Sequence, residues 1–311
     1  MSAQEQKIEA DGSTLTGSVA VIDIGGTHVR CGGSRSGTAL GEVRQFSTDV
    51  FRTGDPVETL EKMIRGFAAE EGLQKFDVVI GVPATLDRNL DRILRVNNIP
   101  ALQGLELRSI LERRFPGRVI LEHDILLQLM GEWFAGSAGG ARTVLGVYCG
   151  TGVGGGFLFN GEPVRSNTTG VELGHIAVRS EGRRCVCGQT DCLEAYASGR
   201  LLVAWSKQYA VPIGHLFVDA EKIPPLADQL EYFLQDQATA IATAVTLIDP
   251  ELVVLGGGIM EMPGYPIEKL IKLIRARLQA PEPANSARFV RATLGRLAAV
   301  YGGMHLTSKR R

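Results

Sequence analysis

One short pattern occurs twice in the sequence, and this repeat constrains the fold more than any other feature. An apolar, β-branched run is followed by a glycine-rich turn and then by a second strand-like run, which together predict a β-hairpin. The two copies are Ser18–Asp23 with Thr27–Cys31, and Thr143–Cys149 with the run FLFNGEPV that follows the glycines. More than a third of the chain separates them, so we expect two domains that each open with the same element.

Strand and helix patterns alternate along the rest of the chain, which is typical of an α/β protein. Further strands are expected at Phe76–Ile80, Arg118–Glu122 and Leu252–Leu255. Helices are expected at Pro56–Glu70, Leu126–Phe134, Asp236–Ile248 and Leu294–Leu306. A length of 311 residues is that of about two domains, and it is sufficient for a large core without disulfides.

Composition excludes several classes of protein. The 33 basic and 34 acidic residues leave a net charge of -1, which argues against a broad nucleic-acid-binding or membrane-binding surface. Residues 1–17 are polar and unlike a signal peptide, and no apolar run approaches the roughly 18 residues that span a bilayer. We therefore expect a cytoplasmic protein. The 38 glycines are not periodic, which excludes collagen, and they indicate tight turns or backbone close to a ligand.

The glycine turns are candidate phosphate sites, because backbone N–H groups in such turns can hold phosphate oxygens. The first turn reads Asp23-Ile24-Gly25-Gly26-Thr27, with Arg30 three residues later. The Thr27 hydroxyl and the Arg30 guanidinium are donors, and Asp23 could hold Mg²⁺ through water. An ordinary tight hairpin is the alternative for this turn alone. The second turn, Gly150-Thr151-Gly152, favours the phosphate interpretation, since two facing turns would form a clamp.

The second turn also contains a literal G-x-G-x-x-G pattern. A dinucleotide-binding fold requires a helix after this pattern, whereas Gly156-Phe157-Leu158-Phe159 is typical of a strand. We therefore reject that fold. The P-loop pattern G-x-x-x-x-G-K-[ST] is absent as well, so any ATP site would use another phosphate-binding geometry.

Three of the five cysteines lie within eight residues, in Cys185-Val186-Cys187-Gly188-Gln189-Thr190-Asp191-Cys192. This is not the spread of a disulfide framework. Zinc prefers four tetrahedral ligands, and His175, ten residues upstream, would complete a Cys₃His set. Three free cysteines in a loop are the alternative. We interpret the cluster as a closed, structural zinc site that would also bring Glu172 and Glu194 near each other.

A carboxylate and a pair of amides follow further strands. Asp124 lies between the strand Arg118–Glu122 and a helix, at a strand end where the sites of α/β sheets gather. A helix N-cap is the alternative for Asp124 from this segment alone. The turn Asn97-Asn98-Ile99-Pro100 carries amides that suit a pair of sugar hydroxyls, although plain turn chemistry explains it equally well.

Taken together, these motifs resemble the ROK family of repressors, open reading frames and sugar kinases, from about Val19 to Leu306. Five motifs occur in the family's order: Asp23-Ile24-Gly25-Gly26-Thr27, Gly81-Val82-Pro83, Asn98-Ile99-Pro100, the glycine run with Glu172-Leu173-Gly174-His175, and the cysteine loop with Cys192-Leu193-Glu194. The resemblance implies an α/β, two-lobed, actin-like (ribonuclease H-like and hexokinase-like) fold with ATP, Mg²⁺ and a sugar in the cleft. It divides the chain into a first lobe, residues 1–122 plus about 295–311, and a second lobe, residues 123–294, which carries the zinc loop.

The same resemblance implies roles for the candidate residues. Asp124 would be the general base that takes a proton from the sugar hydroxyl. Sugar hydroxyls would be held by Asn98, Glu172, His175 and Glu194, while the other nitrogen of His175 binds zinc. The nucleotide and its phosphates would contact Asp23, Gly25, Gly26, Thr27, Arg30, Gly150, Thr151, Gly152, Gly256, Gly257 and Gly258. The zinc ligands would be His175, Cys185, Cys187 and Cys192.

The resemblance favours an aldohexose as the substrate, and D-allose in particular. The features that favour D-allose are Ala84, the Leu-Phe-Val run at 216–218, and the segment from Asp249-Pro250 to Pro263. Many family kinases have Asn at the positions of His123 and Leu126 and Gly at that of Ala84, so these departures point away from an ordinary glucokinase.

Three other functions compete with this interpretation. One is a hexose kinase of the same family that acts on glucose, mannose or N-acetylmannosamine, and another is a non-catalytic sugar sensor. A repressor is disfavoured, because only 22 residues precede Asp23, which is too few for a winged helix-turn-helix module. The family is often dimeric, so a homodimer is a candidate assembly.

Overall fold

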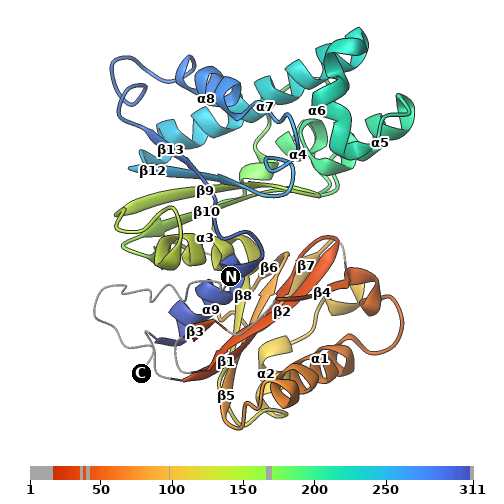
Figure 1. Cartoon of the computed structure of the whole chain (residues 1–311), viewed down its shortest axis with the longest axis vertical. Helices are drawn as coiled ribbons and strands as arrows, with labels where there is room; N and C mark the ends of the chain where they lie inside the picture. The colour runs from red at the N-terminus through yellow and green to blue at the C-terminus, as the bar shows by residue number, and fades with distance from the viewer. Residues whose placement is uncertain (1–16, 36–37, 40–42, 98, 166–169, 309–311) are drawn as a thin grey trace, which may run out of the picture.

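Two β-sheets, one above the other in Figure 1, organise the molecule. The structure is a computed structural model that describes residues 17–35, 38–39, 43–97, 99–165 and 170–308. Two helices lie between the sheets, and further helices cover the outer face of each sheet (Figure 1). The layers therefore run helix, sheet, helix, sheet, helix, so both faces of each sheet are covered, as parallel strands require.

The N-terminal part of the chain builds the first sheet. Its strands are β1 (Ser18–Ile24), β2 (His28–Arg35), β3 (Thr38–Ala39), β4 (Arg44–Ser47), β5 (Phe76–Val82) and β8 (Val119–His123). Their order is β3-β2-β1-β5-β8, β4 also pairs with β2, and β1, β5 and β8 are parallel. A separate hairpin of β6 (Ala84–Leu86) and β7 (Ile93–Val96) follows β5.

The second sheet repeats this arrangement. Its strands are β9 (Thr143–Cys149), β10 (Val153–Phe159), β11 (Glu162–Pro163), β12 (Leu252–Gly256) and β13 (Arg288–Arg291), in the order β11-β10-β9-β12-β13. The hairpins β1–β2 and β9–β10 are antiparallel, and each is extended by two parallel strands. The two predicted hairpins are therefore confirmed.

Helices of each half cover the outer face of its sheet. The first sheet carries α1 (Pro56–Glu70) and α2 (Leu107–Glu112), and the second carries α7 (Pro224–Ile248), α8 (Ile267–Arg275) and the shorter α4 (Leu193–Tyr196), α5 (Gly199–Gln208) and α6 (Leu216–Asp219) (Figure 1). Short 3-10 turns lie at Thr48–Phe51, Pro100–Leu102, Leu173–His175, Ile213–His215, Ala220–Lys222 and Gly295–Leu297. Helix α1 begins as predicted, with Asp55 Oδ1 accepting a hydrogen bond from the Val57 N–H at 2.7 Å.

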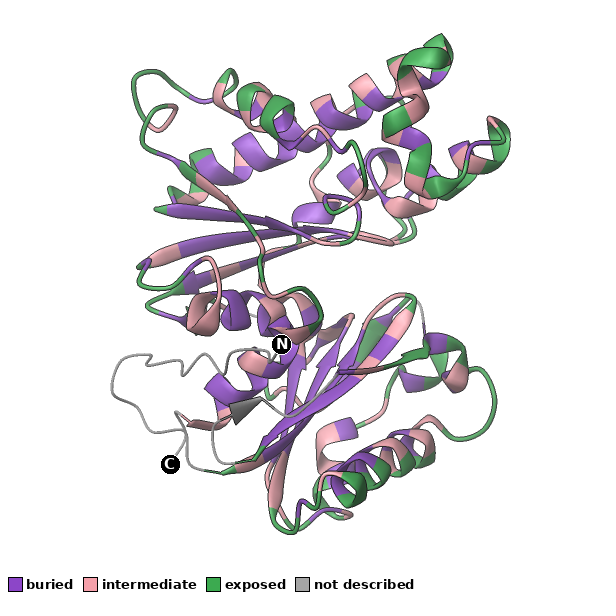
Figure 2. Cartoon of the chain, viewed as in Figure 1, coloured by how far each residue is buried: buried purple, intermediate pink, exposed green. Residues whose placement is uncertain are grey.

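Helices α3 (Asp124–Ala135) and α9 (Ala298–Ser308) form the layer between the sheets. Their buried side chains join strand residues of both sheets in one apolar core, and these inner layers are mostly buried in Figure 2. The helices approach closely because of glycine. A Cβ on Gly131 would lie 1.9 Å from the Ala298 carbonyl oxygen, and one on Gly302 would lie 1.9 Å from that of Leu127. One packed layer, formed by α3 and α9, thus connects the two halves of the molecule.

Several predicted elements have different bounds in the structure; α9, for example, begins at Ala298 and not at Leu294. Helix α7 begins at Pro224, twelve residues before the predicted start at Asp236, because Pro224 and Pro225 occupy the first turn, where proline is tolerated. The glycine run is not one long turn, since only Gly150–Gly152 lie between the strands and Gly154–Gly156 belong to β10. Among the residues that the structure describes, no helix is both long and apolar enough to span a membrane.

Candidate active site

The carboxyl ends of β1, β5 and β8 bring two carboxylates to one edge of the first sheet. The register pairs Asp23 with Gly81 and Val82 with His123, and Asp124 begins α3 directly after β8. A Cβ on Gly81 would lie 3.4 Å from both Asp23 Oδ1 and Asp124 Cα. Glycine at this position therefore leaves room between the two acids, at the sheet edge where α/β proteins place their sites.

Asp124 is a buried carboxylate at the start of α3, with 7% of its surface exposed. Its Oδ1 accepts a hydrogen bond from the Ile125 N–H at 2.9 Å and lies 3.3 Å from His123 Nδ1. The N-cap of α3 is His123, so the N-cap alternative for Asp124 is wrong. Burial raises the pKa of Asp124, and the charge of His123 opposes this effect. A raised pKa makes this carboxylate a stronger proton acceptor than an exposed one.

Asp23 lies beside Asp124 and is paired on one side only. Its Oδ2 lies 3.2 Å from Arg30 Nη1, whereas its Oδ1 is buried and has no hydrogen-bond partner within the described part of the chain. Burial and the charge of Asp124 raise the pKa of Asp23 to about 7, although Arg30 lowers it. Hard cations take oxygen ligands, directly or through water. The free oxygen therefore fits Mg²⁺.

Both glycine turns line one cavity of about 990 Å³, where they face each other at close range. The hydroxyls of Thr27 and Thr151, one from each turn, are 2.8 Å apart and hydrogen-bonded. In the second turn the Gly150 N–H donates to the Gly152 carbonyl at 2.9 Å. This is the facing arrangement that the sequence predicts for a phosphate clamp.

The lining of this cavity contains most of the predicted site residues. From the predicted nucleotide set it includes Gly25, Gly26, Thr27, Arg30, Gly150, Thr151, Gly152, Gly257 and Gly258, and from the sugar set Asp124, Glu172, His175 and Glu194. Asp23 and Gly256 are buried behind the lining. Asn98 lies outside the described residues, so its sugar contact stays a prediction.

The turn after β12 requires glycine. Gly257 has a φ of +92°, and a Cβ there would lie 2.4 Å from the Cys149 carbonyl oxygen. The Ile259 N–H donates to the same carbonyl at 3.0 Å. Since only glycine adopts this backbone conformation so close to another strand without strain, the Gly256-Gly257-Gly258 run fixes one wall of the cavity against β9.

Sequence reasoning missed several lining residues, among them Gln128, Glu132 and Tyr148. Glu132 is fully buried in α3, where its Oε1 accepts the N–H groups of Thr293 and Leu294, both at 2.8 Å. It therefore fixes the connection between β13 and α9. The single charged residue in the segment Leu126–Phe134, which is apolar apart from Gln128, was the signal that could have found it.

Glu194 connects the second glycine turn to α4. Its Oε2 accepts a hydrogen bond from the Val153 N–H at 2.9 Å, and its Oε1 lies 2.9 Å from Arg200 Nη1. A Cβ on Gly152 would lie 2.2 Å from that Oε2, so glycine is required beside it. Both carboxylate oxygens thus already hold groups of the protein, and the sugar contact expected of Glu194 stays a prediction.

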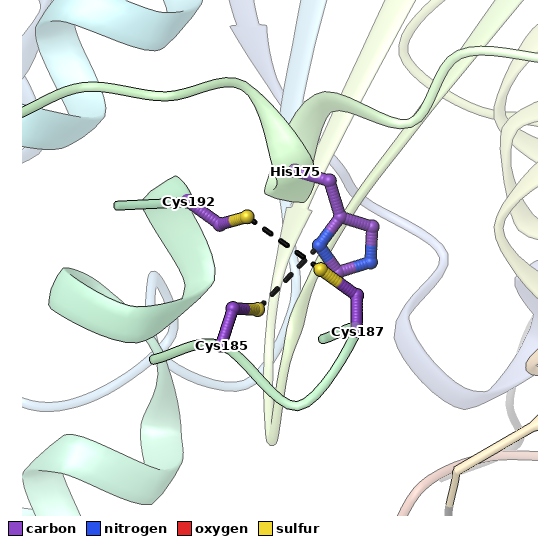
Figure 3. A group of neighbouring side chains, drawn as sticks. All are labelled: His175, Cys185, Cys187 and Cys192. Carbon is purple, nitrogen blue, oxygen red and sulfur yellow. Dashed lines mark hydrogen bonds between the residues drawn. The ribbon is translucent and has the colours of Figure 1, made fainter. Parts of the chain in front are cut away.

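His175 and three cysteines converge on one point in Figure 3. Their four ligand atoms all lie within 4.8 Å of one another. The Sγ atoms of Cys187 and Cys192 are 3.6 Å apart, and Cys185 Sγ lies 3.7 Å from His175 Nδ1. A tetrahedral zinc with Zn–S bonds of about 2.3 Å separates two sulfurs by about 3.8 Å. None of these cysteines forms a disulfide, so the residues fit a structural Zn²⁺.

The Cys₃His cluster joins two segments of the cavity wall. His175 ends the 3-10 turn that follows Glu172, and Cys192 directly precedes α4, which carries Glu194. A metal bound by both segments would therefore hold the two acids on one wall of the cavity, as the sequence predicts.

Comparison with known proteins connects these features to one family. The model of the ROK family matches residues 19–310. The chain belongs to the ROK family. An N-acetyl-D-glucosamine kinase of Escherichia coli O1:K1 / APEC is 32% identical over 311 residues, which cover 92% of this chain and 98% of the relative.

Solved ROK structures have the same architecture. A ROK family glucokinase from Streptomyces griseus, in complex with glucose and AMPPNP, is 27% identical with a TM-score of 0.80, over 93% of this chain and 99% of that chain. A ROK hexokinase from Thermus thermophilus is 29% identical with a TM-score of 0.76, over 93% and 97%. The two-lobed, actin-like fold and the relationship to ROK sugar kinases, both expected from the sequence, are confirmed.

The departures from the ROK pattern occupy different places in the structure. Leu126 is 1% exposed and packs in the core between the sheets, and Ala84 is buried in the core of the first sheet. His123, in contrast, lines the cavity beside Asp124. Of the three departures, only His123 can therefore touch a substrate directly.

Proposed function

We propose that the protein transfers the γ-phosphoryl group of ATP to an aldohexose. The observation that carries this proposal is the position of Asp124, in a cavity bounded by two glycine turns that meet through Thr27 and Thr151. Phosphoryl transfer needs mainly positioning and charge stabilisation. A buried base beside two turns of backbone N–H groups provides both.

Each element of the site has one task in this reaction. The carboxylate of Asp124 accepts the proton of the attacking sugar hydroxyl as that oxygen bonds to phosphorus and the bond to the leaving ADP breaks. The N–H groups of Gly25 and Gly150 already donate to carbonyls of their own hairpins, so the turns Gly25–Thr27 and Gly150–Gly152 offer their remaining N–H groups to the phosphates. Arg30 contributes positive charge beside the first turn. Asp23 would hold Mg²⁺, which supplies charge neutralisation on the phosphates when bound.

The sugar in this proposal is D-allose, phosphorylated on its 6-hydroxyl. Its support is the set of sequence features that distinguish the chain from an ordinary glucokinase, of which His123 lines the cavity next to Asp124. The names of similar proteins point to other hexoses, since they include an N-acetyl-D-glucosamine kinase and a glucokinase. The identity of the hexose therefore needs a direct comparison.

An ATP-consumption assay across a hexose panel tests both parts. The panel contains D-allose, glucose, mannose, N-acetylglucosamine and N-acetylmannosamine, and the product is identified by phosphorus NMR. We expect the highest kcat/KM with D-allose and a 6-phosphate product. A higher kcat/KM with another hexose would contradict D-allose but retain the kinase. Absence of turnover on every sugar, with binding preserved, would contradict the kinase and favour a sugar sensor.

We also propose that the Cys₃His cluster holds one structural Zn²⁺. The observation behind it is the convergence of its four ligand atoms within 4.8 Å of one another, with two of the pairs 3.6 and 3.7 Å apart. Elemental analysis of the purified protein should find one zinc per chain, and Cys187→Ser should lose the metal and lower the melting temperature. A Cys187→Ser protein that retains a full equivalent of zinc would show that the cluster is not the site.

A further inference from the structure

Arg95 connects the two halves of the molecule at the rim of the cavity. It lies on β7, in the hairpin that follows β5, and its side chain reaches the cysteine loop of the second half. Nη1 donates to the Cys187 carbonyl at 2.7 Å, and Nη2 donates to the Val186 carbonyl at 2.9 Å. The two outer nitrogens of one guanidinium thus hold two successive carbonyls of the loop.

The same guanidinium also contacts the cavity wall. Its Nε donates to Asn97 Oδ1 at 3.3 Å, and Asn97 lines the cavity. Arg95 therefore contacts the cysteine loop and a lining residue at once. The planar, forked geometry of Arg suits such a contact, whereas Lys offers a single point charge.

The carbonyls that Arg95 binds depend on how the cysteine loop is folded. Within the loop the Gly188 N–H donates to the Cys185 carbonyl at 3.0 Å, and the Cys185 N–H donates to the Gln189 carbonyl at 2.9 Å. Val186 and Cys187 lie inside this small turn, between two of the cluster's cysteines. A metal bound by the cluster would hold the turn in the shape that presents both carbonyls to Arg95.

We propose that Arg95 is a positioning residue that couples the metal-loaded cysteine loop to sugar binding across the two halves. The inference rests on the proposed function, because it takes the Asn97 side of the cavity as the sugar side. Coupling between two sites is reciprocal. A bound sugar should therefore raise the affinity for zinc by the same factor by which bound zinc raises the affinity for the sugar. Arg95 and Asn97 are solvent-exposed, and the contacts of an exposed charged side chain contribute little. We therefore expect an effect near the lower end of known couplings, about fivefold.

Three variants separate coupling from a general loss of structure. Arg95→Ala removes all three contacts, and Arg95→Lys retains the charge without the fork. The matched control is Arg92→Ala, because Arg92 is exposed on the loop before β7 and pairs with Glu106 of the same half. All three proteins are compared with the wild type by melting temperature and zinc content before further measurement.

The decisive measurement is the rate of zinc transfer to a colorimetric chelator, with and without a saturating sugar from the panel. We expect the sugar to slow zinc release about fivefold in the wild type and in Arg92→Ala, and to have little effect in Arg95→Ala and Arg95→Lys. Calorimetry should show sugar Kd raised by about the same factor in the two Arg95 variants. In steady-state kinetics the sugar KM should rise while kcat changes less than about twofold.

The outcomes against the proposal are distinct from those against the kinase. A sugar that slows zinc release equally in the wild type and in Arg95→Ala overturns the coupling and leaves the proposed function intact. A wild-type protein that binds no sugar of the panel overturns both. A purified wild type without zinc, or an Arg95→Ala protein that loses kcat at unchanged KM, also overturns the coupling.

Discussion

The two hairpins of the molecule share a backbone plan but carry different chemistry. The last residue pair before the turn is Ile24 with Val29 in the first hairpin and Cys149 with Val153 in the second. One residue earlier on the first strand of each hairpin, Asp23 of β1 therefore corresponds to Tyr148 of β9. Their partners on the parallel strands are both glycines, Gly81 opposite Asp23 and Gly256 opposite Tyr148. The helices also correspond, since α3 follows β8 and α9 follows β13, and these two helices pack on each other.

The difference between the halves lies in charge. In the first half Asp23 lies on β1 and Asp124 directly after β8, whereas in the second half Tyr148 of β9 takes the position of Asp23, and β13 ends at the exposed Arg291. In the second half the acid beside the glycine turn, Glu194, comes from α4 and holds the turn's own backbone. In the proposed function, proton transfer and cation binding therefore belong to the first half, whereas the second half would contribute backbone donors alone.

The largest expected effect is that of Asp124→Asn in the first half. The amide keeps the shape of the side chain but cannot accept the proton of the sugar hydroxyl, so kcat should fall at least about a hundredfold. Calorimetry should show that sugar Kd changes little, and zinc content should be unchanged. Near-normal turnover in this variant would show that Asp124 is not the general base, and the proposed difference between the two halves would then be wrong.

The second effect is that of Asp23→Asn, read as a function of pH. Asp23 can bind Mg²⁺ only when its side chain is ionised. The pKa of Asp23 is about 7 in the folded protein. The Mg²⁺ concentration for half-maximal activity should therefore rise as the pH falls below 7, roughly tenfold per pH unit, and this dependence should be absent in the variant.

Stability provides an independent measurement of the same group. Between about pH 4 and pH 7 the folded protein keeps a proton on Asp23 that the unfolded chain has lost, because the ordinary pKa is 3.8. The folded state is therefore stabilised at the acid end, and this contribution is lost as the pH rises through about 7. Urea unfolding at pH 5.5 and 7.0 should show that the free energy of unfolding falls more between these two pH values in the wild type than in Asp23→Asn. Equal slopes would show that Asp23 is ionised throughout.

The third effect, that of Gly150→Ala, tests the backbone half. A Cβ at Gly150 meets no atom within 4 Å and would extend into open space beside the turn. The fold and melting temperature should be unchanged, while the ATP KM should rise about five- to tenfold, or about 1 kcal/mol, because the added methyl group would occupy space that the phosphates need beside the turn. Sugar Kd measured without nucleotide is the control. An unchanged ATP KM would show that the second turn does not bind the phosphates.

Much of this architecture could be predicted from the sequence, because it depends on local patterns. The hairpins, helix α1 and the strand before Asp124 follow from apolar runs, glycine turns and an N-cap, and the Cys₃His cluster follows from close spacing along the chain. The facing of the two turns was a correct prediction that needed their repetition.

The parts that escaped prediction depend on contacts between distant segments. Glu132 and Arg95 act on residues 161 and about 90 positions away, and nothing in their local sequence indicates these partners. The early start of α7 is a different kind of miss, because Leu226, Leu230 and Phe233 already continue its buried face at helical spacing. The orphaned Asp23 Oδ1 required the burial that only packing reveals.

The smallest expected effect is that of Tyr148→Phe, at the position that corresponds to Asp23. The Tyr148 hydroxyl is buried and, within the described ranges, has no hydrogen-bond partner. Burial raises the pKa of Tyr148 well above its ordinary value, so the phenol stays neutral. Removing an unpartnered buried hydroxyl should leave stability within about 1 kcal/mol of the wild type and kcat within about twofold. A tenfold loss of kcat would instead show that the Tyr148 hydroxyl takes part in the reaction. The second half would then contribute a side chain as well as backbone donors.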